Sequence, residues 1–270
     1  MPEWTSILSV AVFVVLAIAE AVVSHREHKE LFERRDTWAN ISLGLITFAT
    51  KLGINLIQLW FYNWLWDNNY VLWKPDVPVV LWYIIGLLIN DFMFYWYHRI
   101  SHTTRFFWAV HVAHHSSEKM NITTAIRGNF VNNIFHGLFW TVMVFMGFAP
   151  WIVVSTDGLS YFYQLWLHTQ IIPKLGPFEW IMNTPSHHRV HHASNPVYLD
   201  KNYAAIFIFW DKLFGTYEVE NEPVRFGLTK PFNAYNPFKI AFYEFGMVIK
   251  ATAAAKGIRG KVYELFRKPY

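Results

Sequence analysis

Long apolar stretches separated by short polar segments make up the first two thirds of the chain. A helix needs about 20 mostly apolar residues to cross a bilayer. Five stretches approach this length, and we expect a helix in each of them: residues 7–23, 38–61, 79–97, 129–148 and 151–167. The pattern predicts an all-α, polytopic membrane protein, because a helix satisfies its own backbone polar groups in lipid.

Three of these stretches need interpretation. The last two are joined only by Ala149 and Pro150, so they form either two spans or a hairpin that enters from one side. The first has neither a preceding basic segment nor a small-residue cleavage site before Ser24, so we interpret it as a membrane helix rather than a signal peptide. Lys51 lies in the second, where we expect a tilted or broken helix whose amine reaches the interface.

The loops indicate an orientation. The loop after the first stretch carries Arg26, Lys29, Arg34 and Arg35, whereas the loop after the second carries only Lys74. Cytoplasmic loops are enriched in Lys and Arg, so the first loop is predicted to be cytoplasmic. Alternating spans then place residues 98–127 and 168–270 on the same side, as a cytoplasmic helical cap.

Composition supports a chain solvated largely by lipid. Hydrophobic residues make up 54% and charged residues 16% of the sequence, against about 25% charged in soluble domains. The absence of cysteine excludes disulfides and thiolate metal sites. The net charge of +4 is not gathered on one stretch, as a nucleic-acid-binding surface requires; basic residues instead flank the apolar runs, as in proteins that meet anionic lipid.

Most of the histidines lie in two short stretches, residues 98–115 and 187–192. One HxxxH and two HxxHH motifs occur there, formed by His98 and His102; by His111, His114 and His115; and by His188, His191 and His192. Positions i, i+3 and i+4 share a helix face, so each motif can direct two or three imidazoles to one point. Eight imidazoles exceed the needs of one ion and suffice for two, with a position left open for oxygen.

A histidine among aromatic residues is usually a hydrogen-bonded core or surface residue. We place His25, His28 and His136 in that class. For the eight motif histidines, that interpretation requires burying many imidazoles together, which is costly unless a metal or complete hydrogen bonding satisfies them. The motifs therefore predict a metal site.

At these residues the chain resembles the fatty acid hydroxylase and sterol desaturase superfamily of membrane di-iron proteins. The resemblance runs from about Asn90 to Gly227 and is carried by DFMFYWYHR at 91–99, WAVH at 108–111 and HHSSE at 114–118. Later strings are most similar to the branch of alkylglycerol monooxygenase and its bacterial relatives: QLWLHT at 164–169, NTPSHHRVHH at 183–192, DKNY at 200–203 and WDKLFGT at 210–216. We expect N-terminal membrane helices at 1–89, the di-iron domain at 90–227 and a basic tail at 228–270.

The resemblance implies two iron ions held by the eight motif histidines, with His168 as a ninth ligand. Gln164 departs from the pattern, because several lipid hydroxylases have histidine there; a water or an open position is expected instead. The resemblance also implies tetrahydrobiopterin as one reductant, since the ether-lipid enzymes use it.

A metal-bound imidazole needs an acceptor for its second nitrogen, often a carboxylate. Asp91 and Tyr95 share a helical stripe with His98 and His102, so either could orient a ligand. Further candidates for this supporting role are Asn121, Gln164, His187, Asp200 and Asp211, although Asp211 could equally cap a turn. Arg99, Arg105 and Arg127 either hold a phosphate headgroup or anchor the chain at the interface.

These features favour a membrane-bound di-iron oxygenase that uses O2 to hydroxylate a lipid, or to cleave it through hydroxylation. A lipid or sterol desaturase with the same metal site is the alternative. A metal transport or storage protein is a third, although its ligands would follow a path across the membrane. The chain lacks a haem domain, a cysteine cluster and a Gly-x-Gly-x-x-Gly fingerprint, so a separate electron donor is expected. The basic segment 251–270 could dock that donor or lie on the membrane surface, and the oligomeric state stays open.

Overall fold

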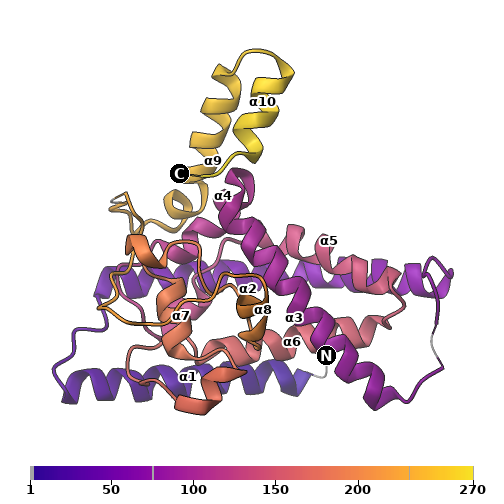
Figure 1. The fold of residues 1–270 in the computed structure, drawn as a ribbon, viewed down its shortest axis with the longest axis horizontal. Helices are drawn as coiled ribbons and strands as arrows, with labels where there is room; N and C mark the ends of the chain where they lie inside the picture. Colours follow the sequence, from indigo (N-terminus) through magenta and orange to yellow (C-terminus); the bar gives the residue numbers. More distant parts are fainter. Residues whose placement is uncertain (1–2, 75, 231, 270) are drawn as a thin grey trace.

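The computed structural model describes residues 3–74, 76–230 and 232–269. Within these residues it is helical and contains no strand, only two isolated bridges, which confirms the all-α prediction. Figure 1 shows the arrangement. The longer helices are α1 (Glu3–Arg26), α2 (Arg34–Asp67), α3 (Val79–Thr103), α4 (Arg105–His115), α5 (Asn132–Phe145), α6 (Pro150–Leu165), α9 (Pro237–Ala254) and α10 (Gly257–Phe266). Shorter ones are η1 (Ile122–Ile126), η2 (Gly176–Trp180), α7 (Pro185–His191), η3 (Pro196–Tyr198) and α8 (Phe209–Leu213).

Two helices, α2 and α3, are long and apolar enough to cross a membrane. Their outward faces are apolar: Leu56 on α2 is 71% exposed and Val80 on α3 is 70% exposed. In water such side chains would be costly, whereas lipid solvates them. The two helices favour a membrane protein.

The lengths of α5 and α6 bear on the question that the sequence left open. They have 14 and 16 residues and are joined by residues 146–149. At 1.5 Å per residue they are about 21 and 24 Å long, which is less than the roughly 30 Å core of a bilayer. Neither helix alone is long enough to cross such a core along its normal.

The centre of the bundle is a core between α3, α5 and α6, which includes Met93, Trp140 and Phe148. Gly86 allows α3 to approach α6, because a Cβ at this position would lie 2.7 Å from Cγ2 of Ile152. Small residues at such crossings permit the close backbone packing on which helix association in lipid depends.

The position of Lys51 corrects our expectation. Its amine does not turn towards the interface but lies 3.8 Å from the centre of the Tyr161 ring on α6 and interacts electrostatically with Asp157. A cation over an aromatic face, near a carboxylate, is stabilised inside the bundle. Helix α2 therefore continues unbroken through this position.

The segment between α6 and α9, which contains η2, α7, η3 and α8, forms a lobe over one end of the bundle (Figure 1). Asp91 ties this lobe to α3. Its buried carboxylate accepts hydrogen bonds from the backbone N–H groups of Ile206 and Phe207, at 2.8 and 3.0 Å, and from the indole of Trp210 at 3.0 Å. A carboxylate that accepts several hydrogen bonds is compensated for its burial.

Candidate metal centre

Four structural elements carry the candidate ligands. His98 and His102 lie one turn apart near the end of α3, and α4 contributes His111, His114 and His115. His168 follows α6, while His188 and His191 lie on α7 and His192 caps it. The 3.6-residue period of each helix turns its motif towards the interior of the protein. Segments about 90 residues apart in the sequence thereby meet in one buried cluster.

The nine imidazoles divide into two groups, in each of which one nitrogen per residue lies within 4.8 Å of the others. The first group contains His98, His102, His111, His115 and His191, and the second contains His114, His168, His188 and His192. The groups are adjacent, because the rings of His115 and His192 stack with centroids 4.4 Å apart. His187, the neighbour of His188, belongs to neither group.

The spacing of the ring nitrogens fits metal coordination. Nε2 of His111 lies 3.0 Å from Nε2 of His98 and 3.1 Å from Nε2 of His115. In the second group, Nε2 of His168 lies 2.8 Å from Nε2 of His188 and 3.2 Å from Nε2 of His114. Two nitrogens bound at right angles to one metal, each at about 2.1 Å, lie about 3 Å apart. The donor set and its spacing therefore fit two metal ions.

Backbone carbonyls hold four of these rings. Nδ1 of His98 donates to the carbonyl of Tyr203 at 2.7 Å, and Nδ1 of His114 donates to that of Arg127 at 2.9 Å. His168 and His191 donate in the same way to the carbonyls of Gln164 and Lys201, at 3.1 and 3.0 Å. A proton on Nδ1 leaves the Nε2 lone pair free. Each ring is therefore fixed in the tautomer that binds metal through Nε2.

Burial keeps the imidazoles neutral. It lowers the pKa of His114 to about 4, although its hydrogen bond to the carbonyl of Arg127 raises it. Burial also holds the pKa of His188, His191 and His192 well below the ordinary value, and neighbouring histidines add to the effect. Nε2 of His191 has no hydrogen-bond partner among the described residues. A buried nitrogen lone pair without a partner is costly, and a metal ion removes that cost.

The acidic candidates do not hold an imidazole directly. Asp91 binds the backbone at 206–207, as described above. Asp211 accepts from the N–H groups of Tyr203 and Ala204, at 2.8 and 2.9 Å. Both carboxylates thus fix the loop whose Tyr203 carbonyl binds His98. Our expectation that a carboxylate side chain would bind a ring nitrogen is replaced by carbonyl contacts that the loop provides.

The other supporting candidates have separate roles. Tyr95 hydrogen-bonds Thr216 at 2.9 Å, and the side chain of Asn121 caps η1. The Gln164 side chain turns back to Ser160, so only its carbonyl contributes to the site. His187 faces Tyr217, with Nε2 3.5 Å from its hydroxyl.

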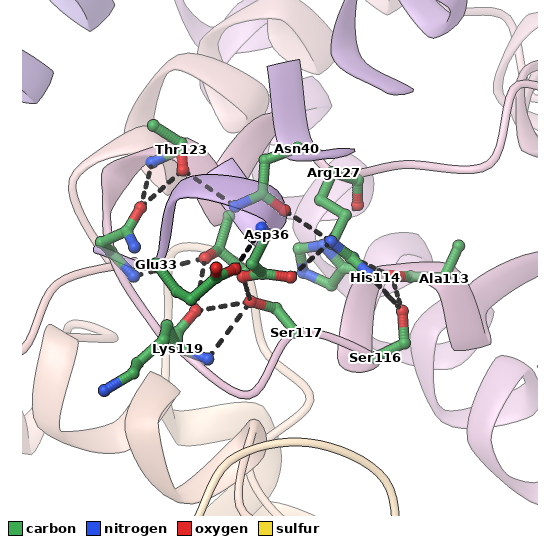
Figure 2. Close-up of polar contacts among 12 residues, drawn as sticks. Glu33, Asp36, Asn40, Ala113, His114, Ser116, Ser117, Lys119, Thr123 and Arg127 are labelled. Atoms are coloured by element: carbon green, nitrogen blue, oxygen red, sulfur yellow. Dashed lines mark hydrogen bonds and ion pairs between the residues drawn. The ribbon is translucent and has the colours of Figure 1, made fainter. Parts of the chain in front are cut away.

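Arg127 was expected to meet a headgroup or the interface, but it is buried. Figure 2 shows its guanidinium between Asp36, Asn40 and Ser116, with Nη1 3.0 Å from Asp36 Oδ1 and 2.7 Å from Asn40 Oδ1. Nε also donates to the carbonyl of Ala113, in the helix that carries His114. A buried charge pair of this kind needs every donor satisfied. The network fixes the backbone of Arg127, whose carbonyl binds His114, and the sequence carried no motif that pointed to it.

A cavity of about 200 Å³ opens onto the first histidine group. Its inner wall includes His102, His115 and His191, and its outer wall includes Asp200 and Lys268. Asp200 adopts a positive φ of 60° and is close enough to Lys268 to interact electrostatically. The cavity therefore joins the histidines to a polar opening near the C-terminus.

The fold and the site favour a class: helical membrane proteins with a carboxylate-free, histidine-rich site that fits metal ions. Comparison with known proteins agrees. Residues 83–216 match the family model described as fatty acid hydroxylase. The chain therefore carries a fatty acid hydroxylase domain.

Named relatives narrow the comparison. The chain is 34% identical over 270 residues to alkylglycerol monooxygenase of Xenopus tropicalis, covering all of this chain and 60% of that protein. It is 36% identical over 258 residues to alkylglycerol monooxygenase of Homo sapiens, covering 95% of this chain and 58% of that protein. The chain is 28% identical over 152 residues to ornithine lipid hydroxylase OlsE of Rhizobium tropici, covering 56% of this chain and 46% of that protein. The chain thus spans about three fifths or less of these relatives, and no solved structure matches it.

Proposed function

We propose that the chain is a membrane-bound di-iron oxygenase that uses O2 to hydroxylate a lipid. The observation that carries this proposal is the pair of adjacent imidazole groups. One group offers five ring nitrogens and the other four, and within each group the nitrogens are close enough together to bind one metal ion. The relatives named as monooxygenases and hydroxylases support the same reaction class. Alkylglycerols are the first substrates to test, because the relatives that cover most of the chain are named for them.

Two irons, when bound, would supply the redox chemistry that activates O2. The first group would hold one iron and the second group the other. Hydroxylation converts a C–H bond, O2, two electrons and two protons into a C–OH group and water. The chain contributes the geometry: carbonyls of Tyr203, Arg127, Gln164 and Lys201 orient the rings, and burial keeps the imidazoles neutral.

We propose that the electrons come from a separate donor, because the given sequence carries no haem, flavin or iron–sulfur motif. Tetrahydrobiopterin is the first reductant to test, by resemblance to the ether-lipid branch. We further propose that the lobe and its cavity face the cytoplasm. The basic loop between α1 and α2 supports this, because it is hydrogen-bonded to Lys119 and Asn121, just after the helix that carries His111, His114 and His115.

The test is isotopic. Purified protein in lipid nanodiscs receives an alkylglycerol, a reductant and ¹⁸O2, and its lipids are analysed by mass spectrometry. One ¹⁸O atom in the product, together with two irons per chain, is the expected result. Loss of two hydrogens without label would indicate a desaturase, and iron binding without any change in lipid would favour storage or transport.

A further inference from the structure

The C-terminal helices form a hairpin that projects from the body of the protein. Figure 1 shows α9 and α10 leaving the bundle across the direction of α2. Helix α9 packs on α4 and buries Ile240, Ala241 and Val248. The proposed metal centre uses no residue of this hairpin, so its exposed faces need another explanation.

Large apolar side chains are exposed along α10. Ile258 is 75% exposed, Val262 46% and Phe266 57%. They are four residues apart, so they form one stripe on the helix. On α9, Phe238 is 58% exposed and Ile249 66%. An exposed stripe of this kind marks an interaction surface.

The charge of the hairpin is strongly one-sided. Its basic residues outnumber its two acidic residues, Glu244 and Glu264. Both acidic residues turn inward, where they meet the buried guanidinium of Arg105, and Glu264 also binds Arg267 at 3.0 Å. Among the described residues, the other cations of the hairpin form no ion pair with its two acidic residues: Lys239, Lys250, Lys256, Arg259 and Lys261. Apolar side chains interleaved with these cations fit an anionic lipid surface.

The hairpin is attached to the protein at the level of the bilayer interface. The N–H of Arg105 donates to the carbonyl of Arg267 at 2.9 Å, and Arg105 begins α4 directly after Thr104, which caps the end of α3. The end of a spanning helix lies at the bilayer interface. The base of the hairpin is therefore held at the level where lipid headgroups meet the protein.

We propose that the α9–α10 hairpin docks in the headgroup layer of an anionic membrane, with the α10 stripe of Ile258, Val262 and Phe266 at the acyl boundary. A membrane is favoured over a second copy of the chain because the lipid-facing surfaces of α2 and α3 already bring the bilayer to this level. A soluble acidic partner would explain the charges, but it would not use the apolar stripe so well.

Docking has a consequence for access to the site, and this consequence rests on the proposed function. Lys268 and Pro269, directly after α10, line the cavity that reaches His115 and His191. A docked hairpin holds the mouth of that cavity at the headgroup layer. A lipid can then present its head end to the cavity without leaving the bilayer.

The absence of cysteine makes the test direct, because single cysteines can be introduced and spin-labelled. Ile258→Cys, Val262→Cys and Phe266→Cys are compared in proteoliposomes of phosphatidylcholine mixed with phosphatidylglycerol. Leu56→Cys on α2 serves as the lipid-exposed reference and Asn221→Cys in the lobe as the water-exposed one. Relaxation by lipid-soluble O2 and by a water-soluble nickel chelate is measured for each label. This measurement needs no turnover, so it stands whether or not the protein proves to be an oxygenase.

The expected result is an oxygen-to-nickel accessibility ratio for the stripe labels about threefold or more above that of Asn221→Cys, approaching that of Leu56→Cys. In pure phosphatidylcholine, or after Lys256→Gln with Lys261→Gln, the ratio should fall. The charge-matched pair Lys174→Gln with Arg225→Gln should leave it unchanged. Nickel-dominated relaxation at all three positions would overturn the proposal, as would spin–spin broadening that shows a second copy on the stripe, or a ratio indifferent to anionic lipid.

Discussion

Two histidine-containing regions of this bundle are both buried, yet they are compensated differently. In the nine-histidine cluster, ring nitrogens face one another at about 3 Å, and the two groups contain no carboxylate. Inside the bundle, His136 lies beside a carboxylate, with Nε2 3.3 Å from Oδ1 of Asp157. Its ring also stacks on Trp140, with centroids 3.7 Å apart. Lys51 completes this second region by facing both Tyr161 and Asp157.

The difference shows what distinguishes a metal site from a structural polar contact. A histidine beside a carboxylate and a stacking ring has favourable electrostatic and aromatic neighbours within the protein. Nine neutral imidazoles compensate one another poorly, because facing lone pairs repel. Only a cation between them makes the arrangement favourable. The comparison therefore predicts that metal binding depends on one region and not on the other.

The largest effect is expected from removing one ligand in each group. His191→Ala and His114→Ala should each abolish turnover and release at least one iron per chain, because both metals would be needed together. Metal analysis of the purified protein checks this. The matched control is the His136→Gln variant, which should retain both irons. Equal iron loss from this variant would contradict the prediction that metal binding depends on the nine-histidine cluster and not on His136.

Replacement of Arg127 comes next. Arg127→Met leaves Asp36 buried beside Asn40 without its counter-charge, which should cost about 3–5 kcal/mol of stability. Because the carbonyl of Arg127 binds His114, the second group should also lose iron sooner. Arg127→Lys should rescue part of the stability. The checks are thermal unfolding and the rate of iron release to a chelator; wild-type behaviour in both would show that the network does not position His114.

A smaller effect is expected from pH in the iron-free protein. The pKa of His114 is about 4 in the folded state, where burial lowers it, whereas an unfolded histidine titrates near 6.5. Between these values the unfolded chain binds more protons, so stability should fall as pH drops from 6.5 towards 4 and stay level above 6.5. For this residue the loss is about 1.4 kcal/mol per pH unit. Unfolding of His114→Ala against pH should show a shallower slope, and parallel slopes would contradict the assignment.

The smallest effect is expected inside the bundle. Asp157→Asn removes the carboxylate beside His136 and Lys51 but keeps the shape of the side chain. Lys51 retains its contact with the Tyr161 ring, so we expect a loss of about 1 kcal/mol, typical of interhelical polar contacts in lipid. Iron content and activity should not change. Thermal unfolding and metal analysis together check both halves of this prediction. A variant that lost iron would connect this pair to the metal centre.

The periodicity of the motifs allowed much of the site to be predicted. An HxxHH on a helix turns its rings to one face wherever that helix lies, so the clustering of His111, His114 and His115 required no tertiary information. The carbonyl partners could not be predicted in the same way. Every residue has a carbonyl, so Tyr203 and Lys201 carry no sequence signature for this role. Arg127 was misjudged because an arginine beside an apolar segment is usually an interface anchor.

The amino-acid sequence by itself determined that the chain is helical, that its lipid-facing stretches are apolar and that its histidines recur at one-turn spacing, because these properties depend on local periodicity. The tertiary structure alone decided how nine histidines divide into two groups, which carbonyl fixes each tautomer and how Lys51 is compensated. The two groups and the compensation of Lys51 depend on contacts between segments separated by tens of residues, which packing brings together. The carbonyl partners, some of them near in sequence, depend on loop conformations that no local periodicity sets. The same holds for the C-terminal hairpin, whose basic composition was visible in the sequence but whose attachment to the end of α3 was not.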